Sequence, residues 1–168
     1  MPDVQVERLT FRFPGGWTVS KYDEWVYYRK RFACMWDEIK AVDLLAVEDD
    51  HTAWFIEVKD YRLSTRTKPT ELADEVARKV FDTLAAMLPA AANANDPDEQ
   101  RSARAVCHAR QLRVVLHLEQ PAKHSVFRPR AIDPAVVKRQ MKALLKPIDA
   151  HPMVVESTRM NSLAWSVT

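Results

Sequence analysis

The pattern of hydrophobic and polar residues predicts a hairpin near the middle of the chain. Two apolar runs, residues 42–47 and 53–58, are separated by a short polar break that includes residues 48–51. Two β-prone runs joined in this way are typical of an antiparallel hairpin. Because nearly every position in both runs is apolar, we expect both faces of this hairpin to be buried.

The same reasoning predicts strands and helices elsewhere in the chain. Besides the hairpin, strands are expected over residues 4–13, 111–119, 153–156 and 163–167. Helices are expected where apolar residues recur at three- and four-residue spacing or a helix-start signal occurs, over residues 21–31, 71–88, 99–109 and 133–146. The expected fold class is α/β (α+β mixed), with a central mixed β-sheet flanked by helices.

The segments between these elements are less regular. Residues 32–40 leave two alternatives open, a strand or an irregular link, and Trp36 is expected in the core. Residues 63–70 and 121–129 are basic and polar, which predicts loops, and residues 89–98 have the Ala, Asn, Asp and Pro content of a linker.

Composition narrows the classes of function. The 168 residues most simply form a single domain, 1–168. The two glycines are adjacent, Gly15-Gly16, so a glycine-rich phosphate loop is excluded. Cys34 and Cys107 lie far apart and, without a signal peptide, indicate reduced thiols in a cytoplasmic protein. No apolar run approaches the roughly 20 residues of a membrane span, so no membrane partner is expected.

Three ionisable residues interrupt the apolar hairpin, namely Asp43, Glu57 and Lys59. The start of one antiparallel strand lies beside the end of the next, and side chains two residues apart share a face. If Asp43 shares the face of Glu57 and Lys59, two carboxylates and one ammonium group converge. Such groups are rarely buried unless they are paired or bound to a metal, so the alternatives are a salt-bridged trio and a functional site.

Asp43, thirteen intervening residues and then Glu57-Val58-Lys59 resemble the signature of the PD-(D/E)XK nuclease superfamily, which has the restriction-endonuclease-like fold. One departure is Val42, which stands where the superfamily signature has Pro. The resemblance implies a metal-dependent endonuclease that hydrolyses phosphodiester bonds in DNA. It also implies that Mg²⁺, with Mn²⁺ as a substitute, is held by Asp43, Glu57 and the Val58 carbonyl, while Lys59 stands beside the attacking water or the scissile phosphate.

In the superfamily a helix before the core strands often adds an acidic metal ligand. Glu24 is the candidate implied by the resemblance, and Asp23 and Glu38 compete with it. The alternative for Glu24 is a solvated helix residue.

Basic residues indicate where nucleic acid would bind, although the net charge is only +2 and any basic surface must be local. The candidates are Arg62, Arg66, Lys68, Lys138, Arg139 and Lys142. The alternative for the last three is an ordinary solvated helix face.

Three interpretations of the whole chain remain open at this point. The first is the nuclease, which would need a homodimer or a partner subunit for sequence-specific cleavage. The second is a catalytically silent module of nuclease fold that binds nucleic acid or a partner protein. The third is a structural α/β domain in which the trio is a salt bridge.

Overall fold

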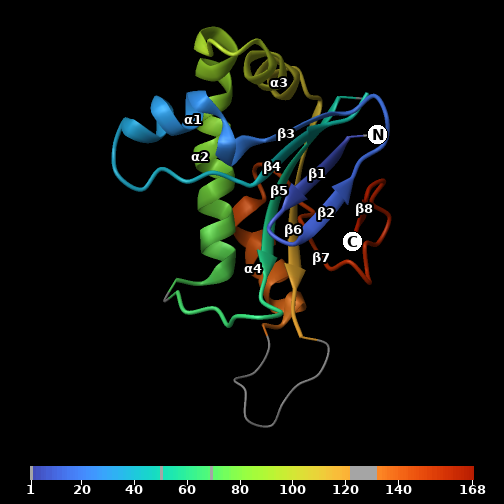
Figure 1. The fold of residues 1–168 in the computed structure, drawn as a ribbon. Coiled ribbons are helices and arrows are strands. Elements are labelled where there is room, and N and C mark those ends of the chain that lie inside the picture. The colour runs from blue at the N-terminus through green and yellow to red at the C-terminus, as the bar shows by residue number, and fades with distance from the viewer. Residues whose placement is uncertain (1, 50, 69, 122–131) are drawn as a thin grey trace.

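A computed structural model describes residues 2–49, 51–68, 70–121 and 132–168 and confirms the mixed α/β class (Figure 1). The strands are β1 (Asp3–Val6), β2 (Leu9–Arg12), β3 (Thr18–Lys21), β4 (Leu44–Val47), β5 (Thr52–Asp60), β6 (Gln111–Glu119), β7 (Met153–Val155) and β8 (Ser166–Val167). The helices are α1 (Val26–Lys30), α2 (Leu72–Asn93), α3 (Pro97–Cys107) and α4 (Pro134–Leu145). Two short 3₁₀ turns, η1 (Tyr22–Glu24) and η2 (Phe32–Cys34), flank α1.

The larger sheet has the strand order β3-β4-β5-β6-β7 and is mixed, as expected. β3 pairs with β4 and β4 with β5 in antiparallel register, which confirms the predicted hairpin. β5 pairs with β6 and β6 with β7 in parallel register. Each parallel pair is joined through a helical crossover, which is the connection that parallel strands require.

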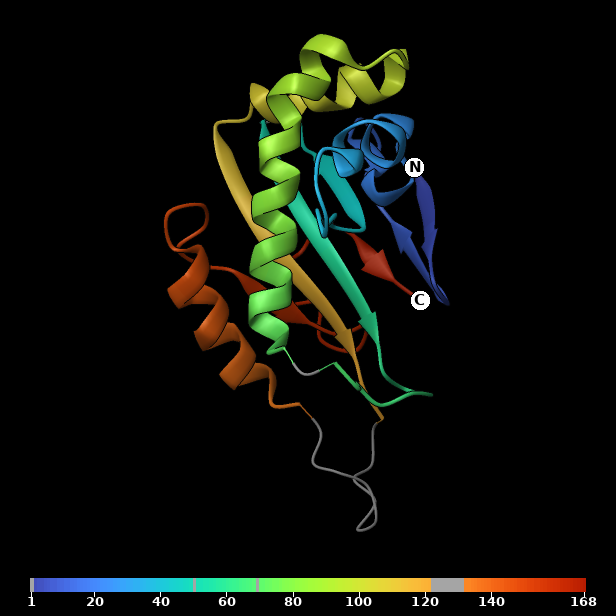
Figure 2. The ribbon, with the colours of Figure 1, turned by 90° about the vertical axis from the view of Figure 1, so that its left-hand side faces the viewer.

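The larger sheet is covered by helices on one face and by a small sheet on the other (Figure 2). The small sheet has the order β1-β2-β8 and is antiparallel. Alternate residues of β5 divide between two hydrophobic clusters, since Phe55 packs with α2 while Ile56 packs with Phe11 and Trp165. Burial on both faces explains why the hairpin strands are apolar at almost every position.

The first forty residues differ most from the predicted elements. The strand expected over residues 4–13 is a hairpin instead, and its turn includes Glu7 at a positive φ of 54°. The helix expected over residues 21–31 is split at Trp25, whose backbone is extended with ψ 134°. The cause is tertiary, because residues 18–21 pair with β4 as an edge strand of the larger sheet.

Two further predictions about this region and α2 are wrong. Trp36 is not in the core, since 63% of its surface is exposed. The linker expected from residue 89 begins later, because α2 continues through Pro89 to Asn93. Buried Ala90 and Ala94 join the core beside α3, and this packing offsets the backbone hydrogen bond that Pro89 cannot donate.

The other predicted elements lie close to their expected positions. β6 has the predicted bounds, and α4 begins at Pro134 with Asp133 as its N-cap, whose side chain accepts from the Ala135 amide at 2.9 Å. The loop expected over residues 121–129 lies outside the described residues except for Pro121. Among the helices of the described chain, none combines the length and the apolar character needed to cross a bilayer.

Candidate functional site

The end of β5 brings Asp43, Glu57 and Lys59 together. Leu44 pairs with Ile56 across the hairpin, so the preceding residue, Asp43, lies beside Glu57. The Val58 amide donates a hydrogen bond of 2.7 Å to Oδ2 of Asp43. Lys59 Nζ lies 2.9 Å from Oε1 of Glu57. The roles in catalysis and metal binding assigned to these residues remain predictions.

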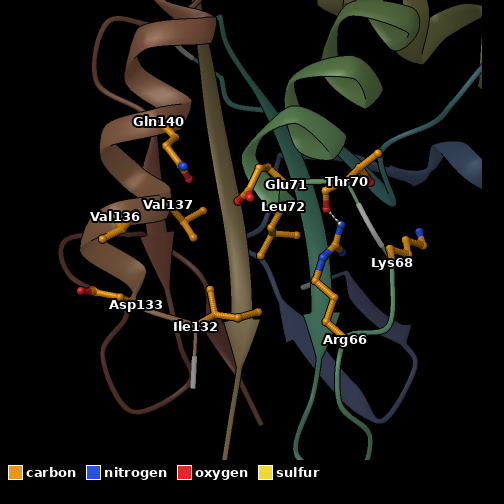
Figure 3. Close-up of a pocket in the computed structure, with 10 residues that line it drawn as sticks. All are labelled: Arg66, Lys68, Thr70, Glu71, Leu72, Ile132, Asp133, Val136, Val137 and Gln140. Atoms are coloured by element: carbon orange, nitrogen blue, oxygen red, sulfur yellow. Dashed lines mark hydrogen bonds between the residues drawn. The ribbon is translucent and has the colours of Figure 1, made fainter. Parts of the chain in front are cut away.

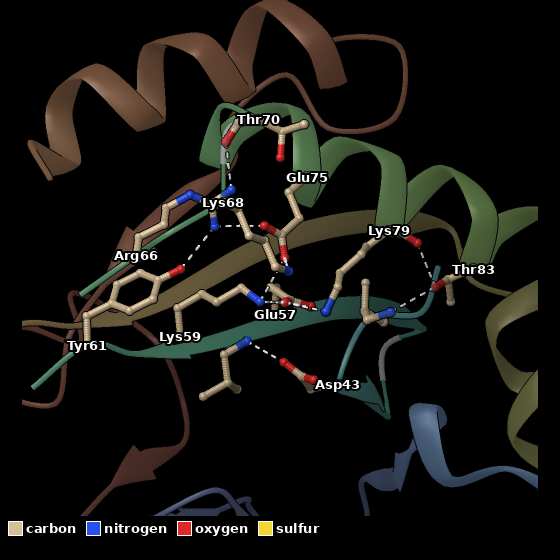
Figure 4. Close-up of polar contacts among 12 residues, drawn as sticks. Asp43, Glu57, Lys59, Tyr61, Arg66, Lys68, Thr70, Glu75, Lys79 and Thr83 are labelled. Carbon is tan, nitrogen blue, oxygen red and sulfur yellow. Dashed lines mark hydrogen bonds and ion pairs between the residues drawn. The ribbon is translucent and has the colours of Figure 1, made fainter. Parts of the chain in front are cut away.

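Helix α2 supplies partners that enclose the two glutamates of this region (Figure 4). The fully buried Glu57 accepts from Lys79 at 2.6 Å as well as from Lys59. Glu75, one turn before Lys79, lies 3.0 Å from Lys59. We call the whole set the Glu57–Glu75 network, which consists of Glu57, Lys59, Arg66, Lys68, Glu75 and Lys79.

The two glutamates of the network have opposite electrostatic environments. Burial, followed by the charge of Asp43, raises the pKa of Glu57 from 4.5 to about 7, although Lys79 and Lys59 oppose the shift. Burial also acts to raise the pKa of Glu75, but hydrogen bonds from Lys68, Lys59 and Arg66 outweigh it and lower that pKa to about 2. Glu75 is therefore a fixed anion, whereas Glu57 gains or loses a proton near neutral pH.

The residues around Glu57 fit a divalent cation only in part. Asp43 and Glu57 are hard oxygen donors of the kind that bind Mg²⁺, and Oε2 of Glu57 is buried without a hydrogen-bond partner in the described part of the chain. However, two ammonium groups already neutralise Oε1 of Glu57 and would repel a cation placed there. No group of three or more His, Cys, Asp or Glu among the described residues is arranged to hold a metal ion. The Mg²⁺ or Mn²⁺ ion thus stays a prediction, and the observed contacts fit an ion-pair network better.

The metal-binding role that the resemblance implies for Glu24 stays a prediction. The Glu24 carboxylate pairs with Lys21 at 2.5 Å, and half of its side-chain surface is exposed. Asp23 is nearer the centre, since burial and then the charge of Asp43 raise its pKa. These contacts fit the alternative of a solvated residue for Glu24.

The predicted nucleic-acid contacts fall into two sets. Near the network, Arg62 is bound through two nitrogens to Asp60, and Arg66 donates to the Tyr61 hydroxyl and the Thr70 carbonyl. Lys68 retains 58% of its side-chain surface in solvent. The second set is on α4, where the three predicted cations are all exposed: Lys138, Arg139 and Lys142.

Sequence reasoning missed Glu75 and Lys79 as parts of this site. Both fall within the helix expected over residues 71–88. Their spacing of four residues places them on one side of α2, and this was the available signal. This side of α2 faces β5 because of how the helix packs on the sheet. The sequence of the helix alone does not predict that packing.

Comparison with known proteins gives one informative similarity. The chain is 27% identical to the cysteine–tRNA ligase of Neisseria meningitidis serogroup A over an alignment of 209 positions, which covers 100% of the chain and 30% of the ligase. The chain therefore spans less than a third of the length of this relative. No protein-family model and no solved structure matches the chain.

This similarity overturns the predicted nuclease function. The relative is a ligase named for tRNA, so the prediction of a metal-dependent endonuclease acting on DNA, with its hydrolase description, is wrong. An acid, a second acid and a lysine at a strand end also arise from ion pairing, as the Glu57–Glu75 network shows. The similarity supports only a more general statement than the predicted one. The chain resembles part of an enzyme, and a nucleic-acid partner is compatible with that resemblance. The likeness of the motif to the PD-(D/E)XK signature stays a prediction about the fold family.

Proposed function

We propose that this chain is an RNA-binding domain whose ligand is tRNA or an RNA of similar structure. The observation that carries the proposal is the match of the entire chain to part of a cysteine–tRNA ligase. We propose binding rather than the joining of cysteine to tRNA, because the chain spans only 30% of that ligase. RNA is proposed in place of the expected DNA, because the relative is a ligase named for tRNA. The expected homodimer or partner subunit stays a prediction.

The surface of α4 supports an RNA ligand. Lys138 and Lys142 are one helical turn apart, and Arg139 lies beside them, so three cations share one exposed side of the helix. The buried side of the same helix carries Val137 and Met141, which fix its orientation on the sheet. Phosphate groups are the dominant source of affinity for nucleic acid, and an exposed row of Lys and Arg on a rigid helix suits them.

The Glu57–Glu75 network supports the same function by organising the segment before α2. Glu75 binds Arg66 at 2.7 Å and Lys68 at 2.8 Å, so one carboxylate from the first turns of α2 holds two basic residues of the preceding segment. Four cations face the two glutamates of the network, which leaves this region positive when both are ionised. A prearranged cationic segment loses less side-chain entropy when it binds phosphate.

The proposal is tested by measuring the affinity for a labelled tRNA transcript by fluorescence anisotropy at several salt concentrations. The triple variant Lys138→Glu/Arg139→Glu/Lys142→Glu should bind at least about tenfold more weakly than wild type. The slope of log Kd against log salt should also fall, by about one for each phosphate contact that is lost. Unlabelled duplex DNA of equal charge should compete less well than unlabelled tRNA.

A matched control carries the same change of charge on other exposed residues. The variant Lys30→Glu/Arg101→Glu/Arg110→Glu alters cations of α1, α3 and the residue that precedes β6. Its affinity should stay much closer to that of wild type. Equal weakening by both triple variants would mean that only net charge matters, and absence of tRNA binding at about 50 mM salt would overturn the proposal.

A further inference from the structure

A pocket of about 460 Å³ lies between the start of α2 and the first turns of α4 (Figure 3). Its apolar wall is formed by Leu72, Ile132, Val136 and Val137. Leu72 and Val137 are each 4% exposed and belong to the hydrophobic core, so this wall is held by the fold. The volume lies within the range of pockets that hold small organic ligands.

Polar groups enter the pocket from both helices. Figure 3 shows Gln140 of α4 and Glu71, the N-cap residue of α2, pointing into the space between the helices, while Asp133 points away from it. Gln140 can donate and accept hydrogen bonds, and an ionised Glu71 can only accept them. The two side chains together favour a planar group that carries an amino group beside a ring acceptor.

Cationic residues border the same pocket. Arg66 lines it and is fixed by hydrogen bonds to Tyr61 and Thr70, and Lys68 lines it with 58% of its side chain in solvent. The pocket thus has an apolar wall, a polar hydrogen-bonding pair and a rim of two cations that share the Glu75 carboxylate as a partner. This division matches a nucleotide, whose flat base is followed by an anionic phosphate.

We propose that this pocket binds one unstacked adenine or cytosine base of the RNA, with the adjoining phosphate at the rim formed by Arg66 and Lys68. The inference rests on the proposed RNA-binding function and names the group that is recognised. The amino group of the base donates to Glu71, and Gln140 contacts the neighbouring ring nitrogen. Uracil carries no amino group and offers only its ring N3–H, whose two flanking carbonyl oxygens repel the Glu71 carboxylate, so uracil binds more weakly.

The inference is tested with oligoribonucleotides of eight adenines, eight cytosines or eight uracils, and with the mononucleotides AMP, CMP and UMP. Wild type should bind the adenine and cytosine oligomers at least fivefold more tightly than the uracil oligomer, by fluorescence anisotropy. AMP and CMP should give saturation-transfer NMR signals that UMP gives only at higher concentration.

Two variants disrupt the pocket by different means. Val136→Trp fills it, and Gln140→Leu removes the amide while nearly keeping the volume of the side chain. Each should abolish the preference for adenine and cytosine. The matched control is Val26→Trp, which adds the same bulk to an exposed valine of α1 and should keep the preference. Thermal unfolding monitored by circular dichroism establishes that each variant is folded. If Val136→Trp does not fold, Gln140→Leu alone tests the loss of the preference.

The outcomes separate this inference from the proposed function. Binding of tRNA without any base preference, unchanged in Val136→Trp and Gln140→Leu, overturns the pocket inference and leaves the RNA-binding function in place. Binding of AMP and CMP that both variants abolish, in a protein that does not bind tRNA, supports the pocket and overturns the function. Failure of both measurements overturns both proposals.

Discussion

Replacing Glu57 by glutamine removes a fully buried carboxylate that contacts two ammonium groups. Glu57 has no exposed surface, and its Oε1 lies 2.6 Å from Lys79 Nζ and 2.9 Å from Lys59 Nζ. Despite these cations its pKa is raised to about 7, because burial and the charge of Asp43 favour the protonated form. The folded protein therefore holds a proton on Glu57 at pH values where the unfolded chain has lost it.

The sign of the pH dependence follows from this difference. The raised pKa contributes stability below about pH 4.5, and this contribution is lost as the pH rises through about 7. The change from 4.5 to about 7, at about 1.4 kcal/mol for each pH unit, makes the folded state about 3 kcal/mol less favourable at pH 8 than at pH 4 through Glu57 alone. Glutamine does not titrate, so Glu57→Gln should lack this dependence.

Urea unfolding at pH 5, 6, 7 and 8 measures the effect. The quantity of interest is the unfolding free energy of wild type minus that of Glu57→Gln, because titrating groups that do not interact with Glu57 contribute equally to both proteins. This difference should fall by about 2 to 3 kcal/mol from pH 5 to pH 8. The control Glu38→Gln removes a carboxylate from an exposed position and should give a difference that is nearly constant. A difference for Glu57→Gln that is equally constant would refute the assignment of Glu57 as a buried acid that titrates near neutrality.

Two further perturbations test the framework around the site. Glu75→Gln should cost about 2 kcal/mol at pH 7, because Glu75 binds Lys59, Arg66 and Lys68, and the cost should shrink by about half at pH 3 as the wild-type carboxylate approaches its pKa of about 2. Thermal unfolding at the two pH values measures it, and an equal cost at both would contradict the ion-pair explanation. Asp149→Ala should cost about 2 to 3 kcal/mol in urea unfolding, because the buried Asp149 accepts from the amide of Val114 at 2.8 Å and its loss leaves that amide unsatisfied. A cost below about 1 kcal/mol would show that another group or water satisfies the amide.

The similarity to part of a tRNA ligase changes how the conspicuous motif is understood. Asp43, Glu57 and Lys59 do converge at the end of a buried hairpin, which was the geometric requirement of the motif. Convergence alone does not determine chemistry, because the same side chains form a stable network when further cations arrive from a neighbouring helix. Lys79 is that further cation, and it occupies the side of Glu57 that faces α2.

The elements that the sequence determined are those whose patterns are local and strong. The apolar hairpin, the strand Gln111–Glu119 and helix α4 follow from period, cap and turn signals that act within a few residues. Asp133 followed by Pro134 marks the start of α4 in the sequence as plainly as in the structure. The proximity of Asp43 to Glu57 also follows locally, because a short hairpin leaves little freedom in its register.

Only the tertiary structure decided what surrounds that hairpin. β6 lies parallel to β5 although two helices separate them in sequence, and the small sheet brings β8 beside β2 from the opposite end of the chain. The same packing places Glu75 and Lys79 against β5 and exposes Trp36. These outcomes depend on which faces pack together across long separations, and a local periodicity specifies that a face is apolar without specifying its partner. The chemistry of Glu57 was decided at this level, since burial in the packed core and then the charge of Asp43 raise its pKa, while Lys79 of α2 opposes the shift.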